Sequence, residues 1–424
     1  MINRIIDVAI RNRWMVMLAV LGFVAFGTYQ YQRLPIDAVP DITNVQVQIN
    51  TQAPGFSPLE VEQRVTFLVE TAMAGLPGLE RSRSVSAYGL SQVTIVFKEG
   101  SNVYFVRQLV NERLQEVRSQ LPANVVPELG PVSTGLGEIY LYTINAVRDA
   151  SKPDGTAYTP TDLRAIQDWI VRPQLRQVPG ISEVNSIGGY AKQYQVAPDP
   201  ARLLSFGISL SDLINALQAN NLNVGAGYIE RNGEQFLVRV PGQLADEEAI
   251  RRAVVSTHDN VPITVNDVAT VSIGKELRTG AATQDGHETV IGTAMMLTGE
   301  NSRTVSHADG EKLKEINKRL PPGSSARPVY DRTVLVNKTN GTVQKNLIEG
   351  AILVIGVLFL FLGNLRAALI TAAVIPLALL ATFTGMVQGG VSGNLMSLGA
   401  LDFGLIVDGT LIVVENCISR LAQA

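Results

Sequence analysis

The sequence predicts an α+β membrane protein, in which a bundle of four transmembrane helices carries a large external domain of two split βαβ (ferredoxin-like) modules and a projecting hairpin. Three observations lead to this prediction. The 79 residues from 346 to 424 contain only six charged side chains, whereas 17% of the 424-residue chain is charged. A 19-residue run without charge lies between Arg13 and Arg33. Between these apolar regions, one order of strands and helices occurs twice.

Composition excludes several other classes of protein. Lys and Arg number 35 and Asp and Glu 38, without a basic run, so the chain lacks the positive surface typical of nucleic-acid binding. A single cysteine, Cys417, rules out an intramolecular disulfide framework and a CxxC metal site. His258, His287 and His307 show no metal-ligand spacing, and there is no GxxxxGK[ST] phosphate loop. We therefore expect no cofactor and no ATP, and no nucleophile–base set indicates a hydrolase.

The first predicted span is the charge-free run after Arg13, because about 20 apolar residues cross the hydrocarbon core of a bilayer. A signal peptide is the alternative, but no A-x-A cleavage site follows, and Tyr29 and Tyr31 are typical of an interfacial aromatic belt. Three further apolar runs complete the bundle: Leu347–Leu365, Ala367–Val387 with a kink predicted at Pro376, and Leu395–Ile418.

Basic residues at the ends of these runs predict the orientation of the chain in the membrane. If the N-terminus is cytoplasmic, one side of the membrane receives Arg4, Arg11, Arg13, Arg366 and Arg420. This arrangement follows the positive-inside rule. It divides the chain into residues 1–33 with the first span, an external domain over 34–345, and three spans within 346–424.

The first external module covers about residues 40–135. Val45, Val47 and Ile49 alternate with polar residues, which predicts a strand. Ser57-Pro58-Leu59-Glu60 combines an N-cap, a proline at the first helical position and a capping-box acid, so a helix begins there and continues to about Leu76. Strands over 79–87 and 92–97 and a helix near 103–121 follow.

The same order recurs 102 residues later and predicts a second module over about residues 136–330. Thr159-Pro160-Thr161-Asp162 begins a helix, Pro179-Gly180 ends it, and strands follow near 181–187 and 193–196. This repeated order is the split βαβ plan, in which helices cover one face of an antiparallel sheet. Arg231-Asn232-Gly233-Glu234 predicts the tip of a hairpin over about 221–244, which is either a contact arm or an ordinary surface hairpin.

Three acidic residues, Asp402, Asp408 and Glu415, lie within the last predicted span. An acid at the bilayer centre costs on the order of 3 kcal/mol, and spanning the membrane does not require one. On a helix, Asp408 and Glu415 lie within about 20° of one another, and Asp402 lies about 120° away. Such carboxyl groups can load and release a proton as their surroundings change, so we predict a proton relay. The alternative is that they only hydrogen-bond neighbouring helices.

Several motifs in the chain resemble one transporter family. The stretch from Asp402-Phe403-Gly404 through Asp408-Gly409 to Glu415-Asn416 resembles the fourth transmembrane helix of the heavy-metal efflux branch of the resistance-nodulation-division (RND) transporters. The resemblance extends over essentially the whole chain through five further segments: 34–44, which begins Leu34-Pro35-Ile36-Asp37, and 57–62, 74–79, 88–93 and 363–366.

This resemblance implies a proton-driven antiporter of heavy-metal cations in the bacterial inner membrane, which is not an enzyme. It implies a homotrimer that works with a periplasmic adaptor protein and an outer-membrane channel. The external domain would be periplasmic, its modules would be porter subdomains, and the hairpin would belong to a docking region. Asp402, Asp408 and Glu415 match the family's proton-relay acids, and Thr410 stands where that branch often has alanine.

The family has a second, repeated half that this sequence lacks, so we interpret the chain as the N-terminal portion of a pump. The other half would supply the metal-binding methionines and a basic partner for the relay. Met295-Met296 is predicted to fill the core, because adjacent strand residues point to opposite faces. No metal-binding residue and no particular ion is therefore predicted. The alternatives are a multidrug-type exporter of amphiphilic organic compounds and a non-transporting chain that only assembles with partners.

Overall fold

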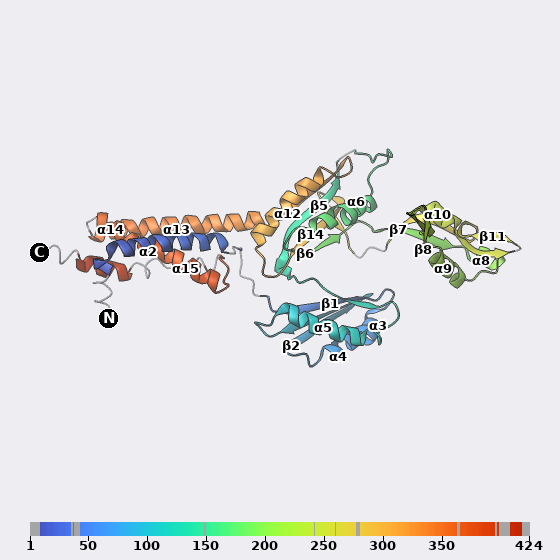
Figure 1. Ribbon diagram of the computed structural model, residues 1–424, viewed down its shortest axis with the longest axis horizontal. Helices are drawn as coiled ribbons and strands as arrows, with labels where there is room; N and C mark the ends of the chain where they lie inside the picture. The colour runs from blue at the N-terminus through green and yellow to red at the C-terminus, as the bar shows by residue number, and fades with distance from the viewer. Residues whose placement is uncertain are drawn as a thin grey trace.

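The computed structural model describes residues 9–34, 37, 43–147, 150–240, 242–258, 260–276, 280–362, 365–394, 397 and 408–417. The molecule is long, and helices α2 (Arg13–Arg33) and α13 (Arg332–Leu362) form one end of it (Figure 1). Three units of strands and helices lie between α2 and α13 in the described chain. Each of the three units has its own cluster of buried hydrophobic side chains.

The first unit is a four-stranded antiparallel sheet with helices packed against it. Alternating side chains of β1 are buried, among them Val47 and Ile49, as expected for a strand with one face on a core. β3 lies between β1 and β2, and β4 pairs with the other edge of β1. The elements are β1 (Gln46–Gln52), α3 (Pro58–Val61), the π-helical turn Glu62–Thr66, α4 (Phe67–Met73), β2 (Leu79–Ala87), β3 (Leu90–Phe97), α5 (Val103–Val117) and β4 (Val126–Leu129).

Both predicted helix starts are confirmed. The Ser57 hydroxyl accepts a hydrogen bond from the Glu60 N–H, and the Glu60 carboxylate accepts one from the Ser57 N–H at 2.9 Å. Thr159 and Asp162 form the same capping box one unit later. The first helix ends at Met73, slightly before the predicted end, because Ala74 is extended and Gly75 adopts a φ of 78°.

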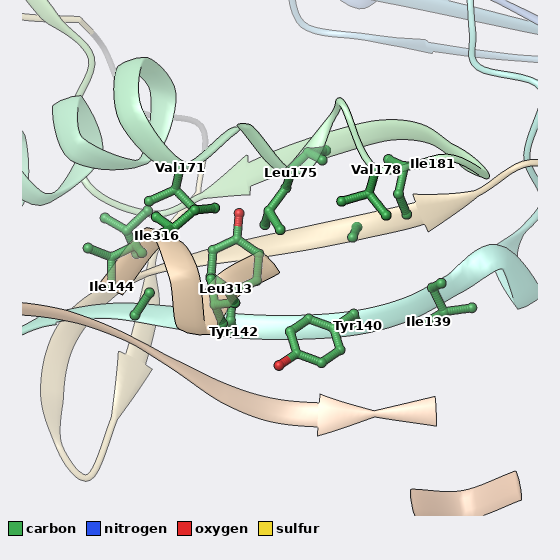
Figure 2. Close-up of a cluster of buried hydrophobic side chains, with 14 of the residues drawn as sticks. Ile139, Tyr140, Tyr142, Ile144, Val171, Leu175, Val178, Ile181, Leu313 and Ile316 are labelled. Carbon is green, nitrogen blue, oxygen red and sulfur yellow. The ribbon is translucent and has the colours of Figure 1, made fainter. Parts of the chain in front are cut away.

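The second unit repeats this arrangement of strands. β14 lies between β5 and β6, and β15 pairs with the other edge of β5, so the order β6-β14-β5-β15 matches β2-β3-β1-β4. Its core contains Tyr142, Leu175 and Leu313 (Figure 2). The elements are β5 (Glu138–Ala146), α6 (Pro160–Ile166), the π-helical turn Gln167–Val171, α7 (Arg172–Leu175), β6 (Ile181–Ile187), β14 (His287–Met296), α12 (Ser302–Asn317) and β15 (Ser324–Asp331), with β13 (Ala282–Gln284) on the edge of β14.

One strand predicted for the second module belongs to another sheet. The strand predicted near 193–196 exists as β7 (Lys192–Pro198), but it pairs with β12 (Ala269–Lys275) rather than within the second sheet. A third unit is inserted between β6 and β14, and local alternation identifies a strand without identifying its partner. The unit also contains α8 (Pro200–Ser205), α9 (Leu210–Ala219), β8 (Val224–Arg231), β9 (Glu234–Val240), α10 (Glu247–Arg252), β10 (Val254–His258), β11 (Val261–Thr264) and α11 (Val265–Val268).

The hairpin prediction is confirmed. β8 and β9 pair antiparallel, with Arg231 opposite Glu234. Between them, Asn232 has a φ of 54° and Gly233 a φ of 77°, as a type I′ turn requires. Apolar side chains remain exposed on its strands, among them Tyr228, Ile229 and Phe236.

The helical end contains two helical stretches that are long and apolar enough to cross a membrane within the described chain: Arg13–Arg33, and Leu365–Gln388 with a break. The break separates α14 (Leu365–Ala372) from α15 (Val374–Gln388) and lies one turn before Pro376, which has no N–H to donate to the preceding turn. The run predicted at 347–365 falls largely within the much longer α13. Of the run predicted at 395–418, the structure describes 397 and a helix over 408–417.

Packing between these helices is local. An added Cβ at Gly27 of α2 would lie 2.7 Å from the Leu380 side chain of α15, so glycine permits this close crossing. Tyr31 and Phe383 bring the same two helices together with ring centroids 5.1 Å apart. Elsewhere α2 exposes apolar side chains such as Trp14 and Leu18, which fits a helix surrounded by lipid.

Candidate functional site

Two of the three predicted relay acids lie on one short described helix. Asp408 and Glu415 stand two turns apart on the helix over residues 408–417, and both side chains are exposed. Asp402, the third predicted acid, lies outside the described residues. The structure thus describes the pair that the sequence places on one stripe and does not test the third position.

The packing of this helix fixes the direction of its acidic stripe. Leu411 contacts the small cluster of Ala368 and Ile375 in α14 and α15. At 100° per residue, Leu411 lies about 60° from Asp408 and about 40° from Glu415 around the helix axis. The two acids therefore border the face that packs against the bundle, about 10 Å apart along the axis.

The surroundings of the two acids determine what they can do chemically. In the described part of the chain, neither Asp408 nor Glu415 has a salt-bridge partner, and the residues between them are mainly apolar. The described residues therefore place two carboxyl groups on one largely apolar helix, without a salt-bridge cation beside either of them.

An ion pair links the start of α13 to Asp37, which follows α2 in the chain. Arg332 begins α13 directly after β15, and its guanidinium donates to Asp37 Oδ1 through Nη2 at 3.0 Å and through Nε at 3.2 Å. The Asp37 N–H donates to the Gly393 carbonyl at 3.1 Å. Burial alone would lower the pKa of Arg332, but the Tyr330 hydroxyl and the Asp37 carboxylate raise it above its ordinary value. We call the region around Asp331, Arg332 and Asp37 the joint.

Met295, Met296 and the three histidines lie on three different elements of the described chain: β10, β14 and α12. Met296 is buried in the core of the second unit, as predicted, whereas Met295 is only half-buried and lies outside this core cluster, so the prediction for the pair holds for Met296 alone. Met295 precedes a β-bulge, and its sulfur accepts from Asn185 Nδ2 at 3.1 Å. His258, His287 and His307 are exposed on three different elements, and among the described residues no three His, Cys, Asp or Glu side chains form a metal-sized group.

Sequence reasoning missed two charged features that the structure reveals. The Asp37–Arg332 pair joins residues 295 positions apart, and no local pattern could have found it. Asp309 is fully buried on α12, among apolar residues at helical spacing that include Val305 and Leu313. An acid inside an apolar stripe of period 3.6 was visible in the sequence and was the signal available.

Comparison with known proteins agrees with this architecture. Residues 5–424 match the AcrB/AcrD/AcrF family. The chain is 64% identical over 424 residues to the cobalt-zinc-cadmium resistance protein CzcA of Cupriavidus metallidurans, and 38% identical over 427 to the cation efflux system protein CusA of Escherichia coli K12. A crystal structure of a heavy metal efflux pump superposes with a TM-score of 0.88 at 34% identity, over 99% of this chain and 42% of that one.

The chain belongs to the AcrB/AcrD/AcrF family of RND transporters. The resemblance to the heavy-metal efflux branch is confirmed by these relatives and by the solved structure. The whole chain aligns with CzcA and with CusA, and it spans 40% of the length of each of these relatives.

Proposed function

We propose that this chain is the N-terminal part of a pump that exports heavy-metal cations in exchange for protons. The observation that carries the proposal is the placement of Asp408 and Glu415 on one stripe of an apolar helix that packs against α14 and α15. Asp402 would be the third member of the proton relay. The names of the relatives support metal cations as cargo, with cobalt, zinc and cadmium as the first ions to test.

In this proposal, four spans anchor the chain in the bacterial inner membrane, with the three α/β units in the periplasm. The first two units would be split βαβ porter modules, because each encloses its third strand between the first and the second. The β8–β9 hairpin, with its exposed apolar strands, would contact neighbouring subunits in a homotrimer. An adaptor protein and an outer-membrane channel would complete the route out of the cell.

The test uses a full-length pump in which these 424 residues are joined to the remaining part of the CzcA relative from Cupriavidus metallidurans. Flux of Zn(II), Co(II), Cd(II), Cu(I) and Ag(I) is measured in vesicles with an imposed proton gradient. Asp408→Asn is expected to reduce metal flux to the level of empty vesicles, because the amide cannot carry a proton. Glu349→Gln is the matched control, since this exposed acid of α13 lies beside Lys345 at 3.8 Å.

Each other outcome counts against a defined part of the proposal. Undiminished flux in correctly assembled Asp408→Asn trimers would remove Asp408 from the relay. Export of amphiphilic organic compounds without metal flux would indicate the multidrug type. Assembled trimers without any flux would favour a chain that only assembles with partners.

A further inference from the structure

The buried face of α12 contains a carboxyl group where a hydrophobic residue is expected. Residues that recur at helical spacing on this face are fully or nearly fully buried: Val305, Asp309, Leu313 and Ile316. Asp309 has no exposed surface, and neither of its carboxylate oxygens has a hydrogen-bond partner among the described residues. A charged carboxylate without partners is very unfavourable in such a position, whereas a protonated carboxyl group is tolerated far better.

The corresponding helix of the first unit, α5, has an apolar residue at this position. Asn102 caps α5 and Asn301 caps α12 in the same way, each accepting from two backbone N–H groups. Counted from these caps, Val110 of α5 occupies the position of Asp309, and both are fully buried. The remaining buried positions correspond as apolar pairs: Val106 with Val305, Leu114 with Leu313, and Val117 with Ile316. Asp309 therefore replaces a core valine in a repeated fold.

Asp331, the acid whose charge acts on Asp309, already has its own partners. The Asp331 carboxylate accepts from the Ser306 hydroxyl and from the Thr333 N–H, both at 2.8 Å. The Tyr140 ring packs within 3.9 Å of an ideal Cβ at Gly310, beside Asp309. Tyr140 and Tyr142 project from β5 in the same core as Leu313 and Ile316 of α12 (Figure 2). Burial raises the pKa of Tyr140 to about 12 and that of Tyr142 further, so both hydroxyls stay protonated near neutral pH.

Within the described chain, no cation on the neighbouring elements forms a salt bridge with Asp309. Arg332 pairs with Asp37, and Arg172 and Arg176 pair with Glu183. The titratable and charged groups on the described elements packed against α12 are Asp331 and Arg327 with Tyr330 on β15, Glu138, Tyr140 and Tyr142 on β5, Arg172 on α7 with Arg176 directly after it, His287 and Glu288 at the start of β14, and Arg332, Lys338, Lys345 and Glu349 on α13.

We propose that Asp309 is a proton-binding residue outside the membrane, which couples the packing of α12 on β5 and on the joint to pH. With a proton bound, α12 closes on the core. When α12 moves away from β5, the carboxyl group reaches water and releases its proton. The joint would carry this motion toward α13, because Ser306 of α12 and the start of α13 share Asp331 as acceptor.

Burial, together with the charge of Asp331, raises the pKa of Asp309 to about 8 in the closed state. In water the same group titrates near pH 4. Between about pH 4 and pH 8, opening of α12 therefore releases one proton, and the opening equilibrium rises about tenfold for each pH unit. The bound proton stabilises the closed state of α12 fully below about pH 4. This stabilisation decreases as pH rises and is lost above about pH 8.

The experiment is hydrogen exchange of the whole 424-residue chain in lipid nanodiscs between pH 5 and 9, with exchange times matched to the intrinsic rate at each pH. Protection of amides in 302–317 is expected to fall about a hundredfold between pH 5.5 and 7.5. Asp309→Asn, which imitates the protonated group, should make this protection independent of pH. Glu311→Gln is the matched control on the same helix, because Glu311 is exposed and paired with Lys314.

Two further measurements decide the outcome if Asp309→Asn does not fold. Asp331→Asn keeps Asp309 but removes the neighbouring charge. The pH above which the protection of α12 stops falling should therefore be lower in this variant. The first unit, with Val110 in place of the acid, should show flat protection throughout. Protection of α12 that is equal at pH 5.5 and 7.5 in the unmodified chain, or that keeps its pH slope in Asp309→Asn, would overturn the proposal. None of these readouts depends on transport.

Discussion

The first and second units share one sheet order and differ in the chemistry of one helix. Both place the third strand between the first and second, and both begin their first helix with a capping box. On the helix before the last strand, however, the first unit buries Val110 and the second buries Asp309. Repetition of a fold preserves the geometry of its core positions, while the side chain at each position decides whether the unit responds to pH.

The two units also differ in the connection that leaves the second strand. In the first unit, a short turn through Gly89 leads directly into β3. In the second, Gly188 and Gly189 lead out of the sheet into an inserted unit, and the chain returns at β13. A fold with short connections can accept a long insertion at such a turn, because the added cost of loop closure grows slowly with length.

The largest expected effect comes from exchanging the two core residues. Val110→Asp should destabilise the first unit by on the order of 4 kcal/mol near neutral pH, because it buries a carboxylate without a partner. The loss should shrink as pH falls toward 4, since the protonated acid is tolerated better. Asp309→Val should stabilise the second unit at neutral pH. Hydrogen exchange of 103–117 and 302–317 measures both changes in the same molecule.

Equal protection of 103–117 in Val110→Asp and in the unmodified chain would contradict this comparison. Val110→Leu separates the effect of charge from that of volume. It enlarges the side chain without adding a titratable group, so any loss of protection it causes should not depend on pH.

A smaller effect is expected at the glycines after the second strands. Alanine at Gly189 would place its Cβ 2.6 Å from the Pro160 carbonyl oxygen at a φ of 62°, whereas at Gly89 the nearest atom lies 3.6 Å away at a φ of 68°. Gly189→Ala should therefore cost on the order of 3 kcal/mol, from backbone strain and overpacking. Gly89→Ala should cost about 1 kcal/mol, from backbone strain alone. Equal midpoints of denaturant unfolding for the two variants would show that the contact around Gly189 is relieved.

The smallest effect is expected at the helix caps. Thr159→Ala and Ser57→Ala should each cost about 1 kcal/mol, because one backbone donor at the helix start loses its acceptor. Although burial opposes it, hydrogen bonds from Thr159 lower the pKa of Asp162, so this cap stabilises the fold above about pH 4 and weakens as pH falls further. In Thr159→Ala, the helix signal measured by circular dichroism should decrease less as pH falls below about 4. An unchanged pH profile would show that Asp162 does not act through this cap.

Local elements of the fold were predictable from short stretches of sequence. The strands at 79–87 and 181–187, both capping boxes and the turn at Asn232-Gly233 depend on neighbouring residues, and the structure confirms them. The partner of β7 was not predictable, because strand pairing across an insertion depends on the whole unit. In the candidate site, the common stripe of Asp408 and Glu415 follows from helix geometry alone, whereas their exposure depends on which helices pack beside them.

The sequence alone determined the class of this protein. Uneven charge and apolar runs of membrane length predicted a membrane protein, and the resemblance of the motif around Asp402, Asp408 and Glu415 to RND transporters of the heavy-metal branch supplied the family. Only the tertiary structure placed Arg332 against Asp37, inserted the third unit between β6 and β14, and buried Asp309 without a partner among the described residues. The physical reason is the distance along the sequence over which each interaction acts. Periodicity, caps and turns are fixed within a few residues, whereas burial and ion pairing depend on groups that only the folded chain brings together.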